Sequence, residues 1–93
     1  MTYLVLEHPQ VSITINGFSL KVQRDYVTIK NILTATPRLN PMFSAIREYA
    51  LPSGLRYYEY ADNILPAVLQ YRVFDADNSW QRGLVWIAGA MPY

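Results

Sequence analysis

The strongest structural signal in the sequence is residues 11–22, which read VSITINGFSLKV. Asn16-Gly17 is a preferred pair for a two-residue type I′ turn, because both residues tolerate a positive φ. With that turn fixed, apolar and polar residues alternate in both arms, and the apolar side chains share one face. We therefore expect a β-hairpin over 11–22 whose apolar face is made by Val11, Ile13, Ile15, Phe18, Leu20 and Val22.

A second hairpin is predicted over about residues 68–87. From 69 to 74, bulky apolar residues alternate with polar ones, which is typical of a half-buried strand. Residues 75–79, DADNS, are the most polar stretch of the chain and consist largely of turn formers. They predict the loop of this hairpin, and residues 81–87 supply its second strand.

One helix is predicted over about residues 41–51. Asn40-Pro41 is typical of an N-cap followed by proline at the first helical position. After it, apolar residues recur at spacings of three and four, which indicates an amphipathic helix that lies on a sheet. Pro52-Ser53-Gly54 predicts the end of this helix.

Two shorter segments complete the prediction. Residues 3–7 predict a strand, since the consecutive apolar run Leu4-Val5-Leu6 is typical of a strand covered on both faces. Residues 25–33 allow two interpretations. The β-branched run at 27–29 slightly favours a strand that extends the first hairpin. The alternative is a helix with Asp25 as its N-cap and an apolar stripe of Tyr26, Ile29, Ile32 and Leu33.

These elements predict a single small α+β domain over residues 1–93, mainly antiparallel sheet, with the 41–51 helix packed on one face. Residues 88–93 are expected to form an apolar extended C-terminal tail, because small residues and a late proline disfavour a helix there. No charged side chain occurs from 84 to 93, so the tail should be covered. It docks on its own sheet or on a neighbouring subunit.

The composition is rich in apolar residues and poor in charge. Of the 93 residues, 52% are hydrophobic and 16% are charged, whereas soluble domains carry about 25% charged residues. Eight tyrosines and two tryptophans supply most of the aromatic rings, and these residue types are enriched where surfaces bury against one another. The composition favours burial in an oligomer or on a partner over a merely tyrosine-rich core and rim.

Charge and cysteine usage narrow the function classes. The net charge of +1 gives no field that attracts nucleic acid or an anionic membrane. The chain has no cysteine, hence no disulfide framework and no thiolate metal site. The N-terminus lacks the features of a signal peptide, and no apolar run approaches the ~20 residues of a membrane span. We expect a soluble protein of the cytoplasm or of a virion.

Catalytic residue patterns are sparse, and we expect a protein that is not an enzyme and holds no cofactor or metal. His8 is the single histidine, and no cysteine or serine motif accompanies it. Asp75 and Asp77 resemble the start of a calcium loop, but Trp80 and Trp86 stand where an EF-hand needs glycine and glutamate. Glu59 and Asp62 have no sequence signal that places them in a cleft.

Nucleic-acid binding has one candidate cluster, Arg56 with the tyrosines at 57, 58 and 60, which would suit base stacking and phosphate contact. Glu59 interrupts the cluster and no other basic stripe occurs. Tyrosines close together on a strand are more often core or interface residues.

The sequence therefore favours a non-enzymatic structural or assembly protein, a self-associating subunit or decoration piece that acts through protein–protein contacts. The alternative is a small binding protein or inhibitor of another macromolecule. In composition the chain resembles small virion, capsid and phage assembly subunits, a likeness that has no motif and transfers no site residue. The residues expected at the interface are Tyr57, Tyr58, Tyr60, Trp86, Met91 and Tyr93.

Overall fold

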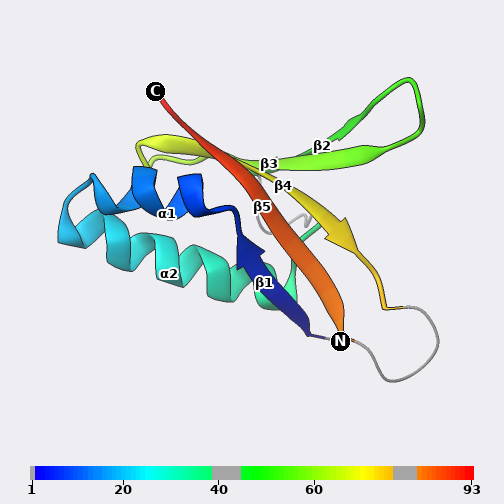
Figure 1. Ribbon diagram of the computed structural model, residues 1–93, viewed down its shortest axis with the longest axis horizontal. Helices are drawn as coiled ribbons and strands as arrows, with labels where there is room; N and C mark the ends of the chain where they lie inside the picture. Colours follow the sequence, from blue (N-terminus) through cyan, green and yellow to red (C-terminus); the bar gives the residue numbers. More distant parts are fainter. Residues whose placement is uncertain (1, 39–44, 77–81) are drawn as a thin grey trace.

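The computed structural model describes residues 2–38, 45–76 and 82–93. The chain forms β1 (Tyr3–Glu7), α1 (Pro9–Asn16), α2 (Leu20–Ala35), β2 (Ile46–Ala50), β3 (Arg56–Tyr60), β4 (Ala67–Phe74) and β5 (Gly83–Pro92). The five strands make one sheet in the order β1-β5-β4-β3-β2, and both helices lie on the same side of it (Figure 1). The prediction of a mainly antiparallel α+β domain is confirmed.

The predicted hairpin over 11–22 is wrong, because this stretch forms α1, a turn and the start of α2. Pro9 occupies the first turn of α1, where its missing N–H costs nothing, and the Nδ1 atom of His8 accepts the Gln10 N–H at 3.1 Å. Gly17 ends α1 as its C-cap with a φ of −75°, so the positive φ of a type I′ turn does not occur. Ser19 then caps α2 by accepting the Val22 N–H.

The apolar residues of 11–22 fit a helix because several are also four residues apart. Val11 and Ile15 lie on one face of α1 and are fully buried. Ile13 and Leu20, which the hairpin needed on its apolar face, are 65% and 68% exposed. The alternation was therefore compatible with two periods, and burial against the sheet selects the helical one.

Residues 25–33 lie inside α2, so the helical interpretation of this segment is correct. The N-cap is Ser19 rather than Asp25, and the helix begins five residues before Asp25. Tyr26, Ile29 and Leu33 form its buried stripe, at spacings of three and four.

The hairpin predicted over about 68–87 is confirmed as β4 and β5, which pair antiparallel. Arg72 faces Trp86 and Phe74 faces Leu84 across this pair, and the register shifts between Gln70 and Tyr71. The strand predicted at 3–7 is also confirmed as β1. It pairs parallel to β5, which is possible because the chain between them passes through the two helices.

The helix predicted over about 41–51 is wrong where the structure describes it. Residues 41–44 lie outside the described residues, and Ile46–Ala50 form β2, which pairs antiparallel with β3. Pro52-Ser53-Gly54 forms the turn of this hairpin, with Gly54 at a φ of +88°, rather than the end of a helix. The strand is selected because Ile46 is buried opposite Tyr60 in the sheet.

Residues 88–92 are extended, as predicted for the tail, and they belong to β5. Met91 pairs with Val68 and Ala90 with Leu69, and the Tyr93 N–H donates to the carbonyl of Pro66 at 3.1 Å. The tail therefore docks on its own sheet. This removes the basis for expecting it to reach a neighbouring subunit.

The core lies between the helices and the side of the sheet that they cover, which we call the covered face. Val11 and Ile15 of α1 and the buried stripe of α2 meet every second side chain of the strands there. Tyr58 and Tyr71 stack at 5.6 Å between ring centroids, and the Tyr71 hydroxyl donates to the Pro37 carbonyl at 2.7 Å. The strand residues that complete this core are Tyr3, Ile46, Tyr60, Leu69, Val85 and Ile87.

Candidate protein-interaction surface

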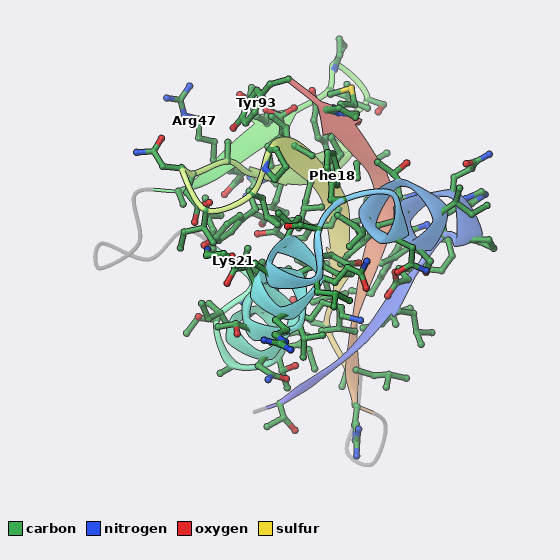
Figure 2. All side chains as sticks on the ribbon, turned by 90° about the vertical axis from the view of Figure 1, so that its left-hand side faces the viewer. Phe18, Lys21, Arg47 and Tyr93 are labelled. Atoms are coloured by element: carbon green, nitrogen blue, oxygen red, sulfur yellow. The ribbon has the colours of Figure 1, made fainter. Side chains whose placement is uncertain are left out.

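The opposite side of the sheet, which we call the open face, has no described helix or strand over it. Because successive side chains of a strand point to opposite faces, each buried residue has neighbours that point to the open face. In β5, Val85 and Ile87 are buried, whereas Leu84 and Trp86 are half-buried on the other side. Figure 2 looks onto the helix side, with the helices in front of the sheet.

Five apolar side chains gather on the open face where β1, β5 and β4 lie side by side. Leu4 pairs with Leu84, which pairs with Phe74; Leu6 pairs with Trp86 in the next row. Leu4, Leu6 and Phe74 are 43%, 44% and 41% exposed. A contiguous exposed apolar group of this kind marks an interaction surface more often than scattered apolar residues do. We call it the open-face patch: Leu4, Leu6, Phe74, Leu84 and Trp86.

Two cationic or aromatic side chains border the open-face patch. The guanidinium of Arg72 lies 4.8 Å from the centroid of the Phe74 ring, in a cation–π contact. The His8 ring meets Trp86 edge-on at 6.3 Å between centroids. Both contacts restrict the aromatic rings of the patch, so covering these rings would cost less side-chain freedom than covering unrestrained ones.

A short polar segment follows the patch along the strands. The Gln70 side-chain amide donates to the Glu59 carboxylate at 3.0 Å, and these two residues face one another across β4 and β3. On the neighbouring strand β5, Gly89 pairs with Gln70 and contributes no side chain. The middle of the open face is therefore polar but internally hydrogen-bonded.

The β2–β3 hairpin extends away from the body of the sheet (Figure 1). Its pairing to β4 covers only Tyr58, Glu59 and Tyr60, so among the described residues 47–57 pair with no strand outside the hairpin. We call residues 47–57 the arm.

One side of the arm is mostly apolar and continues the open face, with Arg47 opposite Glu59 at its base. Tyr49 and Tyr57 face one another in the register and stack at 5.1 Å between centroids. Toward the tip, the Leu51 N–H donates to the Leu55 carbonyl at 2.8 Å, and these leucines are 42% and 40% exposed. The other side carries the Arg56–Glu48 ion pair at 3.0 Å. The arm is therefore amphipathic.

The structure divides the six predicted interface residues. Three of them, Tyr57, Trp86 and Met91, lie together on the open face. Tyr58 and Tyr60 are 4% and 3% exposed and belong to the protein's own core.

Tyr93, the sixth predicted interface residue, is exposed (labelled in Figure 2). It follows the last residue of β5, whereas Leu84 and Trp86 lie near the first. Tyr93 borders a shallow pocket with Val22 and residues 62–66. The proposed nucleic-acid cluster is not assembled either, since Arg56 is paired with Glu48 and its tyrosines are divided between the two faces.

Sequence reasoning missed Leu4, Leu6, Phe74 and Leu84 of the patch. The run Leu4-Val5-Leu6 was interpreted as a strand covered on both faces, whereas the structure covers only the side of Val5. In 69–74 the alternation puts Phe74 on the side of Gln70 and Arg72, so the pattern predicts a polar face there rather than an apolar patch.

The acidic residues and the histidine that could carry chemistry have structural partners. His8 caps α1. Asp75 binds Arg38 through two hydrogen bonds of 2.8 Å and accepts the Tyr3 hydroxyl, and these bonds hold the pKa of Asp75 below its usual value. Asp62 accepts the Tyr60 hydroxyl at 2.6 Å and the Ile64 N–H at 2.9 Å.

Glu7 lies in the groove between β1 and the helices. Its carboxylate accepts the Ser12 hydroxyl at 2.7 Å and the Lys30 ammonium at 3.0 Å. Burial acts to raise the pKa of Glu7, but the bonds from Ser12 and Lys30 outweigh it, so this pKa is lowered. Burial raises the pKa of the nearby Tyr26 hydroxyl strongly.

Within the described ranges, no group of three or more histidine, cysteine, aspartate or glutamate side chains could hold a metal ion. Neither described helix has the length and apolarity to cross a membrane.

Comparison with protein-family models, with curated proteins and with solved structures finds no match to this chain.

Proposed function

We propose that this protein is a non-enzymatic self-associating subunit, and that the open face of its sheet is where copies meet. The observation that supports this is the open-face patch, five contiguous apolar side chains on a sheet whose other face is already filled by the helices. Sheets with two apolar faces are covered on both sides in proteins, and a second sheet is a common cover.

The driving force is the removal of apolar area from water, at roughly 25 cal/mol per Å². Trp86 lies in the middle of the patch between Leu6 and Arg72, and tryptophan at the centre of an interface contributes disproportionately to binding. The net charge of +1 opposes association only weakly. Association of this kind should depend little on salt.

Analytical ultracentrifugation of two matched variants tests the proposal. Leu6→Glu places a charge inside the open-face patch, whereas Ile13→Glu places the same charge on the helix side, at a residue that is 65% exposed. We expect Leu6→Glu to sediment as a monomer, because a carboxylate would be buried without a partner. Ile13→Glu should sediment like the unaltered protein.

Circular dichroism melts of both variants establish that they are folded. If the unaltered protein stays monomeric at high concentration, self-association is wrong. The same patch would then favour the alternative, a small binding protein or inhibitor of another macromolecule. If Ile13→Glu dissociates the protein and Leu6→Glu does not, copies meet through the helices.

A further inference from the structure

The outer edge of β1 is a second binding feature of the molecule, separate from the open face. β1 is an edge strand, and among the described residues no strand lies beside it on the side away from β5 (Figure 1). An edge strand presents a row of backbone N–H and C=O groups without sheet partners, and such a row is a template for one more strand. The outer edge of β1 can therefore accept an extended chain.

The hydrogen bonds to β5 fix which residues of β1 present these groups. The His8 N–H, just after β1, donates to the Ile87 carbonyl at 2.9 Å. Because successive residues of a strand point their backbone groups to opposite sides, the even-numbered residues of β1 bond to β5. Tyr3, Val5 and Glu7 therefore present their N–H and C=O groups outward, at the spacing that an added strand requires.

A groove of about 330 Å³ lies beside this edge, and residues 3–5 form its β1 wall. Leu4 points to the open face, whereas Val5 packs against the core of the covered face. The groove touches both residues, so it follows the edge of the sheet rather than either face. Its volume is within the range of clefts that bind ligands.

The opposite wall of the groove is one side of α2. Val27, Asn31 and Thr34 line it at spacings of four and three, which places them on one stripe of the helix. Val27 is 52% exposed, so this stripe is distinct from the buried stripe that packs α2 on the sheet. The stripe offers one apolar and two polar side chains to a chain that lies in the groove.

The charge of the groove favours an acidic partner. Lys30 and Arg82 line it, and its described lining residues include no aspartate or glutamate. Lys30 is paired with Glu7 at 3.0 Å, so the remaining positive charge is that of Arg82. Arg82 is exposed and directly precedes Gly83, which pairs with Tyr3 at the start of β1. A cationic groove attracts acidic side chains and disfavours basic ones.

We propose that the groove between β1 and α2 binds an extended, acidic peptide segment of a partner protein, which adds to β1 as a further edge strand. Its backbone bonds to Tyr3, Val5 and Glu7, and an acidic side chain meets Arg82. In this mode of recognition the main-chain hydrogen bonds give affinity and the alternate side chains give specificity. The site does not depend on self-association, because the outer edge of β1 is separate from whatever covers the open face.

Selection from a phage-displayed library of random peptides on the unaltered protein supplies the probe. Two charge-reversed variants then test the groove. Arg82→Glu changes its lining, whereas Arg24→Glu makes the same change of net charge at an exposed residue of α2 outside it. We expect acidic peptides that bind Arg82→Glu about tenfold more weakly, because the reversal removes an attraction and adds a repulsion. Arg24→Glu should bind them like the unaltered protein.

Strand addition is tested through the backbone. Amide hydrogen exchange measured by NMR should slow at the Val5 and Glu7 N–H groups when a selected peptide binds. Two further peptides carry N-methyl groups at alternate residues, one in each phase. Only one phase faces β1 in an added strand, so one methylated peptide should lose its affinity and the other should keep it.

Several outcomes would overturn the proposal. A library without enriched peptides, or selected peptides that shift the resonances of Leu6 and Trp86 instead, would exclude the groove. Equal affinity of both methylated peptides would exclude strand addition, and equal losses for Arg82→Glu and Arg24→Glu would exclude the acidic contact. Protection of the Val5 N–H that rises with protein concentration alone would mean that a second copy occupies the edge. Sedimentation of the unaltered protein tests self-association separately, so either proposal can fail while the other stands.

Discussion

The covered face and the open face of the sheet are made by the same strands, yet their side chains end in different environments. Ile87 of β5 is fully buried under α1, and its neighbour Trp86 is half-buried on the other side with no described element over it. Both faces carry large apolar residues. The two faces differ because both helices pack on one of them. The helices come between β1 and β2 in the sequence.

Under the proposed function, this difference assigns folding and association to separate sets of residues. The covered face has aliphatic and tyrosine side chains that meet helices at close to zero exposure, so it supplies the stability of the single chain. The open face keeps its apolar side chains within reach of a second molecule. Mutations on the two faces should therefore affect different measurements.

The largest expected effect is a difference in stability loss between alanine variants of two adjacent residues, Ile87 and Trp86. Ile87→Ala should lower the free energy of unfolding by about 2–5 kcal/mol, because it leaves a cavity beneath α1. Trp86→Ala should change the stability of the monomer by only about 1 kcal/mol, since its side chain already contacts water, but it should abolish self-association. Urea unfolding at low concentration and sedimentation at high concentration measure the two effects.

Equal losses of stability from both variants would contradict the comparison, because they would place Trp86 in the core of the single chain. If Ile87→Ala abolished association without lowering stability, Ile87 would belong to the interface rather than to the core.

Where only one period fitted the sequence, the prediction of the fold succeeded. The 68–87 hairpin alternates around a polar loop that no helix could include, and β4 and β5 form there. The 11–22 stretch alternates too, but Val11 and Ile15 are also four apart, and Pro9 and Ser19 stand at helix starts. The turn propensity of Asn16-Gly17 was outweighed by two caps and by burial against the sheet.

The helix predicted over 41–51 failed for the converse reason. Ile46, Tyr49 and Ala50 have helical spacing, but a short isolated helix has little stability of its own without packing against the rest of the fold. Pairing with β3 gives the same residues a ladder of hydrogen bonds and a stacked partner in Tyr57. That partner is seven residues or more away in the chain, so spacing within 41–51 cannot reveal it.

The sequence predicts the type of candidate surface, apolar and aromatic, better than the residues that form it. Low charge and many aromatic rings predict burial against another surface, which stays a prediction. Of the residues named for it, Tyr57, Trp86 and Met91 lie on the open face. Tyr58 and Tyr60 are predicted at the interface with Tyr57, but alternation along β3 sends them to the opposite side, where they are buried. Choosing the right side requires knowing where the helices pack.

A smaller effect is expected from a glycine on the covered face. A Cβ at Gly83 would overlap the ring of Tyr3 and lie 3.1 Å from the Phe74 carbonyl. Tyr3 is buried and its hydroxyl is bonded to Asp75 at 2.8 Å, so it cannot move aside without breaking that bond. Gly83→Ala should therefore cost about 1–3 kcal/mol in urea unfolding.

Gly89→Ala is the matched control on the open face. Its Cβ would come no closer than 4.0 Å to the Gln70 amide oxygen, an ordinary contact. We expect a change of stability within about 0.5 kcal/mol. A Gly89→Ala variant as destabilised as Gly83→Ala would mean that the two faces are equally crowded in the single chain.

The smallest effect concerns the pH dependence of stability. We expect part of it to come from ionisation of Glu7, which lies on the covered side of the sheet. The pKa of Glu7 is lower in the folded chain than in the unfolded chain, so its ionised form stabilises the fold above the unfolded value of about 4.3. That contribution is lost as the pH falls through the folded pKa. Glu7→Gln keeps the groove filled but removes the charge. Its stability should therefore be about 1–2 kcal/mol lower at pH 7 and should fall less steeply below pH about 4.5.

Lys30→Gln leaves Glu7 in place but removes the cation 3.0 Å from it, so its pH profile should lie between those of Glu7→Gln and the unaltered protein. Self-association of both variants should stay unchanged, because Glu7 and Lys30 contact one another in the groove between β1 and α2, on the far side of the sheet from Trp86. A parallel acid transition for Glu7→Gln and the unaltered protein would show that another carboxylate controls it. A change in the sedimentation of Glu7→Gln at pH 7 would mean that the two faces are coupled.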